Sequence, residues 1–150
     1  MTRINIIAPL DGTVVELENV PDEVFAQKMA GDGVAINPIG GIVVAPVAGD
    51  LLKLFPGGHA FGIVTDEGIE LIVHIGLDTV ELKGEGFENI ATEGQKVQVG
   101  TPIVRFDRAA IEHLGKEIIS PVVSSGSGTV VWRATGTVRA GQDVLFVLEV

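Results

Sequence analysis

Two histidines stand in short apolar segments, and they are the residues of this chain best suited to chemistry. His74 interrupts ELIVHIGLDTV at 70–80, a run that otherwise has the composition of a buried strand. Side chains of a strand alternate between faces, so the odd positions from 69 to 75 form one apolar face and His74 lies on the other. A strand of Ile, Val and Leu has no packing need for an imidazole. His74 therefore indicates a functional site.

The second histidine is His59, in FPGGHAFGIV. The Pro-Gly-Gly predicts a turn, so His59 begins a strand that runs to Thr65. The DEG loop at 66–68 leads back into the His74 strand, and the two strands are predicted to form a hairpin. The histidines are about equally far from its turn, which sets them roughly opposite each other. Facing residues have Cβ atoms about 4.5–5.5 Å apart, so we expect two imidazoles in contact.

Three interpretations of such a pair compete. The first is a structural pair with satisfied hydrogen bonds. The second is a zinc site, in which two histidines and a carboxylate from Glu70, Asp78 or Glu81 hold a catalytic metal. The third is phosphohistidine chemistry. There a neutral imidazole nitrogen attacks phosphorus, a hydrogen bond to its other nitrogen fixes the tautomer, and a second imidazole donates to the phosphoryl oxygens.

The elements that must position the histidines are short strands. Apolar or alternating segments, separated by Gly, Pro or Asp, predict strands at 14–17, 41–45, 51–54, 61–65, 69–75, 103–107, 129–133 and 144–150. Residues 20–33 and 107–117 favour short helical turns, the second with Asp107 as its N-cap. Strands at this spacing indicate an all-β fold, an antiparallel β-sandwich or a barrel-like arrangement.

Internal repeats indicate a duplicated β-motif. IAPLDGTVVEL at 7–17 matches VAPVAGDLLKL at 44–54, and VQVGTPIVRF at 97–106 matches VRAGQDVLFV at 138–147. The repeats are too few and too irregular for a solenoid. The chain has 150 residues and neither a linker nor a low-complexity segment. We therefore expect a single domain over residues 1–150.

Composition excludes several classes of protein. The chain has no cysteine, which excludes disulfides, thiol catalysis and cysteine metal sites. The formal charge of −10 argues against nucleic acid and anionic membranes, and favours a basic protein partner. No apolar run approaches the roughly 18 residues of a membrane span. The opening MTRINIIAPLDG lacks the pattern of a signal peptide, so we expect a cytoplasmic protein.

One segment resembles a known family. GIELIVHIGLDTVELKGEGF at 68–87 is similar to the active-site segment of the glucose-type IIA proteins, the EIIA-Glc family of the bacterial phosphoenolpyruvate:sugar phosphotransferase system. HAF at 59–61, VFAQKMAGDGVAINP at 24–38, and the strand starts IIAPLDG and VVAPVAG also resemble that family. The resemblance covers nearly the whole chain.

The resemblance implies a β-sandwich with a duplicated motif and a role as a phosphoryl carrier. Such proteins accept phosphoryl from the phosphocarrier HPr and pass it to the cysteine of a IIB domain of a sugar permease, which chooses the sugar. The matching phosphorylated nucleophile is His74, through Nε2, and the matching support for the phosphoryl group is His59. No cofactor or metal is required. The resemblance also allows a zinc ion at His59 and His74, shared with a partner carboxylate.

The resemblance further implies a partner surface. Its members here are the apolar side chains and two flanking carboxylates that would meet a partner arginine: Phe25, Phe55, Ile72, Val80, Asp22 and Asp78. Both phenylalanines lie beside predicted turns, so we expect them to be partly exposed. The competing interpretation is core packing for the apolar side chains and a helix cap for Asp22.

The chain departs from the resembling family at one position near His59. Most of that family has a threonine two residues before the second histidine, where its hydroxyl would form a hydrogen bond with a histidine, whereas this chain has Gly57.

The alternative function is a zinc-dependent hydrolase of related β-architecture, such as the lysostaphin-type peptidases. Those need a late His-x-His pair, and only His113 follows His74 here. Biotinyl and lipoyl carriers need a lysine beside a residue such as Met at a hairpin tip, which the chain lacks.

Overall fold

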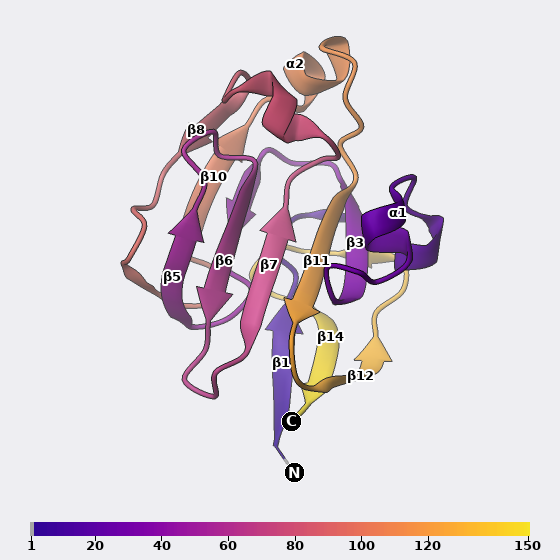
Figure 1. The fold of residues 1–150 in the computed structure, drawn as a ribbon, viewed down its shortest axis with the longest axis vertical. Coiled ribbons are helices and arrows are strands. Elements are labelled where there is room, and N and C mark those ends of the chain that lie inside the picture. The colour runs from indigo at the N-terminus through magenta and orange to yellow at the C-terminus, as the bar shows by residue number, and fades with distance from the viewer. Residues whose placement is uncertain (1) are drawn as a thin grey trace.

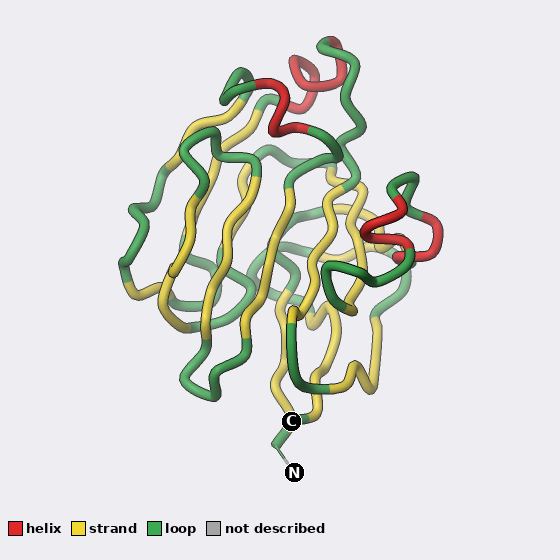
Figure 2. The backbone as a smooth tube through the Cα atoms, in the orientation of Figure 1, coloured by secondary structure: helices red, strands yellow, loops and turns green. Residues whose placement is uncertain are grey.

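The computed structural model describes residues 2–150, so Met1 of the expected 1–150 domain lies outside the described residues. Nearly all its regular structure is β-strand (Figures 1 and 2). The strands are β1 (Arg3–Ile7), β2 (Gly12–Val15), β3 (Asp32–Pro38), β4 (Ile42–Val44), β5 (Gly49–Leu54), β6 (Ala60–Val64), β7 (Glu70–His74), β8 (Phe87–Asn89), β9 (Lys96–Val97), β10 (Pro102–Phe106), β11 (Ser120–Ser125), β12 (Thr129–Arg133), β13 (Thr137–Val138) and β14 (Val144–Glu149). The helical segments are η1 (Leu17–Asn19), α1 (Glu23–Ala26), η2 (Thr79–Leu82) and α2 (Arg108–His113).

The strands of residues 2–150 form three antiparallel sheets. The largest has the order β13-β2-β3-β11-β7-β6-β5-β9, and the two smaller ones have the orders β1-β14-β12 and β4-β10-β8. In Figure 1, β5, β6, β7, β11 and β3 lie side by side, and the two ends of the chain meet below them. Pairing of β1 with β14 brings the ends together. The arrangement is the predicted antiparallel β-sandwich.

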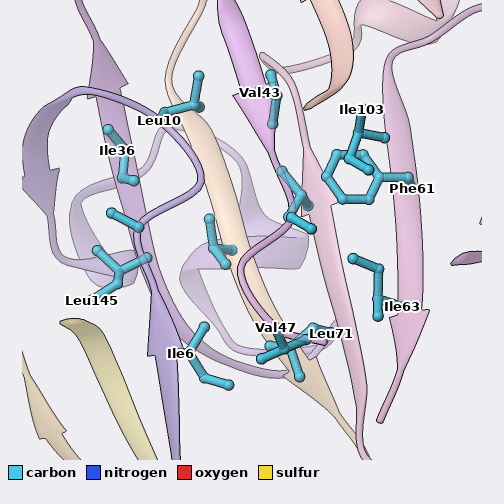
Figure 3. Close-up of a cluster of buried hydrophobic side chains, with 14 of the residues drawn as sticks. Ile6, Leu10, Ile36, Val43, Val47, Phe61, Ile63, Leu71, Ile103 and Leu145 are labelled. Atoms are coloured by element: carbon cyan, nitrogen blue, oxygen red, sulfur yellow. The ribbon is translucent and has the colours of Figure 1, made fainter. Parts of the chain in front are cut away.

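The main core lies on one face of the largest sheet, which we call its inner face. Odd-numbered side chains of β6 and β7, such as Phe61, Ile63 and Leu71, are buried there. Figure 3 shows Phe61 beside Ile103, a residue of the smaller sheets, and Leu145 belongs to the same cluster nearer Ile36. The alternation predicted for 69–75 is therefore confirmed. It leaves His74 on the opposite, outer face, where a smaller apolar cluster packs under η1 and α1.

The duplicated motif is confirmed by equivalent hydrogen bonds. Ile7 N donates to Pro46 O and Val44 N donates to Pro9 O, each at 2.9 Å, so the two Ala-Pro segments bond each other reciprocally. The second repeat pair joins in the same way. Gly141 N donates to the carbonyl of Ala8, and Gly100 N donates to the carbonyl of Ala45. The two halves thus hold each other around the core.

The structure corrects two expectations about the elements. Strands β3 and β11, near the middle of the largest sheet, were not predicted, because the Gly and Pro of β3 and the Ser and Pro of β11 are typical of turns. The helix expected within 20–33 is only the short α1, which ends before the predicted GDG stop. Lys28 takes a left-handed φ of 60° and Met29 N bonds Val24 O, a Schellman ending without glycine.

No helix within residues 2–150 combines the length and apolar character that crossing a bilayer requires.

Candidate functional site

The hairpin of β6 and β7 positions the two histidines at one end of the largest sheet. The register differs by one residue from the prediction, since Ala60 is the residue opposite His74. His59 lies in a bend before β6 rather than within it, and its carbonyl accepts from Ile75 N at 2.7 Å. The bend brings the imidazoles together on the outer face. Their ring centroids are 5.6 Å apart and their planes meet at 67°, so the predicted contact is present.

The His74 ring is held by one short hydrogen bond. Its Nδ1 lies 2.6 Å from the carbonyl oxygen of Gly76. A carbonyl oxygen only accepts hydrogen bonds, so Nδ1 carries the proton and donates it. The neutral ring then keeps its lone pair on Nε2. This is the tautomer that a nucleophilic Nε2 requires.

Both imidazoles favour the neutral form. Burial lowers the pKa of His74 below 6.5, although the Gly76 hydrogen bond and the charges of Asp22 and Asp78 oppose this shift. Burial and then the charge of His74 lower the pKa of His59. The uncharged form of each ring, with one nitrogen protonated and a lone pair on the other, is therefore favoured at neutral pH, and that lone pair is available for reaction with an electrophile.

Gly76 has the backbone conformation that this geometry needs. Its φ is +73°, in the left-handed region that favours glycine. A Cβ at this position would lie 2.7 Å from Glu117 O and 2.7 Å from the Thr79 methyl group. The alternation of the strand predicted that Gly76 shares a face with His74. In the structure, the carbonyl of Gly76 orients the His74 ring through a hydrogen bond.

His59 is held by packing. Only 8% of the residue is exposed, and the Phe55 ring lies 4.9 Å from its own, centroid to centroid. Among the hydrogen bonds of residues 2–150, one joins the His74 ring and none joins the His59 ring. A Cβ at Gly57 would lie 3.5 Å from His59 Nδ1, within ordinary contact distance. Gly57 has no side chain to contact His59, whereas the threonine of the resembling family would place one beside that ring.

The residues of the expected partner surface differ in exposure. Phe55 and Val80 are 38% and 56% exposed, Asp78 is exposed, and Ile72 and Asp22 are half-buried. Phe25 is only 8% exposed, which contradicts the expected partial exposure. Its ring packs in the outer-face cluster and against His74, with 5.4 Å between ring centroids. Phe25 therefore supports the His74 ring and offers little surface to a partner.

The two acidic residues hold different places. Asp22 caps α1, since its carboxylate accepts from Val24 N at 2.9 Å, and its charge acts on the His74 ring. Asp78 takes a left-handed φ of 57° directly before η2. Between Phe55 and Ile72 lies a hollow of about 180 Å³, and Lys53 and Glu70 border it. Lys53 was not included in the predicted partner surface, although its ammonium lies 5.2 Å from the centre of the Phe55 ring and the two residues stand two apart in the chain.

A catalytic zinc would need a third ligand beside the histidines. Within residues 2–150 no group of three His, Asp or Glu side chains is placed to hold a metal ion. Two of the candidate ligands are engaged elsewhere, since Glu70 accepts from Ser125 Oγ at 2.6 Å and Glu81 pairs with Lys116. The described donor set does not fit the zinc-hydrolase alternative.

Comparison with known proteins decides the family. A family model described as "phosphoenolpyruvate-dependent sugar phosphotransferase system, EIIA 1" matches residues 4–130. The chain belongs to this family. As a member of the EIIA 1 family it is a phosphotransferase component of sugar transport.

Individual relatives agree with the family assignment. The chain is 45% identical over 149 residues to a "PTS system glucose-specific EIIA component" of Haemophilus influenzae, covering 98% of this chain and 90% of that protein. It is 52% identical over 120 residues to a protein of the same name from Staphylococcus aureus, covering 80% and 72%. A solved structure, "glucose permease IIA from Mycoplasma capricolum", superposes with a TM-score of 0.92 at 41% identity, covering 99% and 97% of the two chains.

Proposed function

We propose that residues 1–150 form one EIIA domain in which His74 carries a phosphoryl group. The group comes from phospho-HPr and goes to the cysteine of a IIB domain of a sugar permease. The observation that supports this role is the bond from His74 Nδ1 to Gly76 O, which leaves the lone pair on Nε2. The relatives named as glucose-specific make glucose the sugar to test first. These partners act in the cytoplasm, where we place the chain.

In the accepting step, His74 Nε2 attacks the phosphorus of the donor in line. A nitrogen–phosphorus bond forms as the bond from phosphorus to the donor breaks, and the electron pair of that bond returns to the donor. The proton stays on Nδ1 and remains hydrogen-bonded to Gly76 O. This hydrogen bond stabilises the positive charge that the ring gains. His59 lies within reach to donate a hydrogen bond to the phosphoryl oxygens.

In the second step, the cysteine sulfur of the IIB domain attacks the same phosphorus. The nitrogen–phosphorus bond breaks, and its electron pair returns to Nε2. The ring recovers the neutral state that burial favours. The carrier therefore ends the cycle as it began, and the route requires no cofactor.

Exposed residues around the pair suit a basic partner with an apolar patch. Phe55 and Val80 offer apolar area, and Asp78 offers a carboxylate beside the His74 ring. The net charge of −10 steers such a partner toward the chain. We propose that HPr and the IIB domain use this surface in turn.

The test is incubation with enzyme I, HPr and labelled phosphoenolpyruvate. We expect acid-labile, alkali-stable label on the parent and none on His74→Gln. His113→Gln is the matched control, since His113 is an exposed histidine on α2, and it should label like the parent. An unlabelled parent, with both donor proteins shown to be phosphorylated, would contradict the proposal. Label retained by His74→Gln would contradict the assignment of the carrier.

A further inference from the structure

The turn after His74 is held by a serine that lies far away in the sequence. Ser120 begins β11 and is fully buried. Its hydroxyl oxygen accepts from Gly76 N at 3.2 Å and donates to Ile118 O at 2.8 Å. The serine thus joins β11 to the residue whose carbonyl orients the His74 ring.

Two successive peptide groups of this turn are fully bonded. In the first, the Ile75 carbonyl accepts from Thr79 Oγ1 at 2.6 Å, and the Gly76 N–H donates to Ser120. In the second, Leu77 N–H donates to Glu117 O at 2.9 Å, and the Gly76 carbonyl accepts from His74 Nδ1. Bonding at one end of a peptide group strengthens bonding at the other, because the amide is polarised.

We propose that Ser120 is a positioning residue for phosphoryl transfer. Its hydroxyl holds the 75–77 turn in the orientation in which the Gly76 carbonyl accepts from His74 Nδ1, and so keeps the lone pair on Nε2. The proposal rests on the carrier role of His74 proposed above. It concerns the free protein, before any partner binds.

The physical reason is the cost of an unpaired buried N–H group. Without the Ser120 hydroxyl, the Gly76 N–H would have no partner in a buried place, which costs about 1–3 kcal/mol. Glycine at φ +73° is free to rotate toward another conformation. A turn that rotates to relieve the N–H moves the next carbonyl away from His74 Nδ1. The ring then loses the bond that selects its tautomer.

A second serine on the same strand provides the matched control. Ser124 lies four residues further along β11, on the same face, and it is also buried. Its hydroxyl has no hydrogen-bond partner within residues 2–150. Replacing Ser124 by alanine removes the same atom from the same strand. It leaves the turn after His74 untouched.

The experiment measures the imidazole ¹⁵N shifts of unphosphorylated protein at neutral pH, together with the rate of phosphoryl acceptance from phospho-HPr. In the parent and in Ser124→Ala, we expect the His74 tautomer with hydrogen on Nδ1 and the same rate. Ser120→Ala should show a mixture of tautomers and a rate about tenfold lower, the loss that one ordinary hydrogen bond predicts. Ser120→Thr, which restores a hydroxyl, should recover both readouts.

Two results would overturn the proposal. One is a Ser120→Ala protein with the parent's tautomer and rate. The other is an equal loss in Ser120→Ala and Ser124→Ala, which would assign the effect to packing of β11. Should Ser120→Ala not fold, Ser120→Cys puts a somewhat larger, weaker hydrogen-bonding group at the same position and is subject to the same two criteria.

The two proposals can fail separately. The ¹⁵N shifts are measured without any partner protein, so they report on the turn whether or not His74 accepts phosphoryl. A parent that shows the expected tautomer but takes no label would contradict the carrier role alone. A parent that takes label on His74, with a tautomer indifferent to Ser120, would contradict the positioning role alone.

Discussion

The ring centroids of His59 and His74 lie 5.6 Å apart, yet the chain fixes the two rings in different ways. His74 ends β7 and is fixed by a hydrogen bond to a turn that is itself fully bonded. His59 lies in a bend before β6 and is fixed by packing against Phe55. A nucleophile needs one nitrogen committed and the other free. A supporting donor needs only to reach the phosphoryl oxygens. The difference in anchoring therefore matches the division of labour that we propose.

The largest effect that tests this comparison is on onward transfer. His59→Gln removes the packed imidazole that would donate to the phosphoryl oxygens and puts a flexible amide in its place. We expect it to accept phosphoryl like the parent and to pass it to a IIB domain roughly 10²-fold more slowly, the scale of a lost hydrogen bond to a charged group. Single-turnover transfer from the labelled variant measures this rate. A variant unable to accept the group would reverse the roles of the two histidines.

The next effect concerns the glycine that orients His74. Gly76→Ala should lower the free energy of unfolding by roughly 2–4 kcal/mol, since it combines a positive φ with clashes against Glu117 O and Thr79. Gly68→Ala is the control at the other end of β7. Its φ is +82°, but nothing lies within 4 Å of the added Cβ, so we expect a loss of about 1 kcal/mol. Denaturant titration measures both, and equal losses would show that the clash at Gly76 is relieved.

The sequence predicted local features better than pairings. Alternation in 69–75 placed His74 on the outer face, and the turn signals around 56–58 and 66–68 predicted the hairpin. The histidines were predicted to be roughly opposite each other, and they are one residue out of exact register, because the loop centres on Glu67 and so pairs Val64 with Glu70 and Ala60 with His74. Phe25 was expected at the surface because it lies near turns, whereas the outer-face cluster under α1 buries it.

Other parts of the site depend on contacts between distant segments. Ser120 meets Gly76 from 44 residues away, through the pairing of β11 with β7. The sequence gives no spacing that links the two, and Pro and Ser in β11 even argue against a strand there. The exact role of Gly76 was hidden for the same reason. Tertiary pairing, and not local propensity, builds the turn that holds the His74 ring.

A third effect is confined to mildly acidic pH. Both imidazoles have a pKa below 6.5 in the folded chain, so the unfolded chain binds more protons just below that pH. The free energy of unfolding therefore falls as the pH drops from 7.5 through 6.5 toward 5.5. The double variant His59→Gln and His74→Gln should show a weaker fall over this range. An identical pH dependence in parent and double variant would contradict the lowered pKa values.

The smallest effect is expected from a substitution that gives His59 a hydrogen bond, as His74 already has. Gly57→Ser places a hydroxyl near His59 Nδ1 and should fix one tautomer of that ring, with a gain of about 0.5–1.5 kcal/mol in stability. Gly57→Ala adds the Cβ without the hydroxyl and serves as the control. The ¹⁵N shifts of the His59 ring and denaturant titration distinguish the Gly57→Ser variant from the Gly57→Ala control. Unchanged His59 shifts in Gly57→Ser would show that the hydroxyl does not reach the ring.

The central claim is that His74 Nε2 takes the phosphoryl group. Its most direct test is a long-range ¹H–¹⁵N correlation spectrum of the phosphorylated chain, which distinguishes the two ring nitrogens of each histidine. We predict that the phosphorus is bonded to Nε2 of His74, that Nδ1 of His74 still carries its proton, and that the His59 ring is unmodified. Phosphorus on His74 Nδ1, or on either nitrogen of His59, would contradict the account.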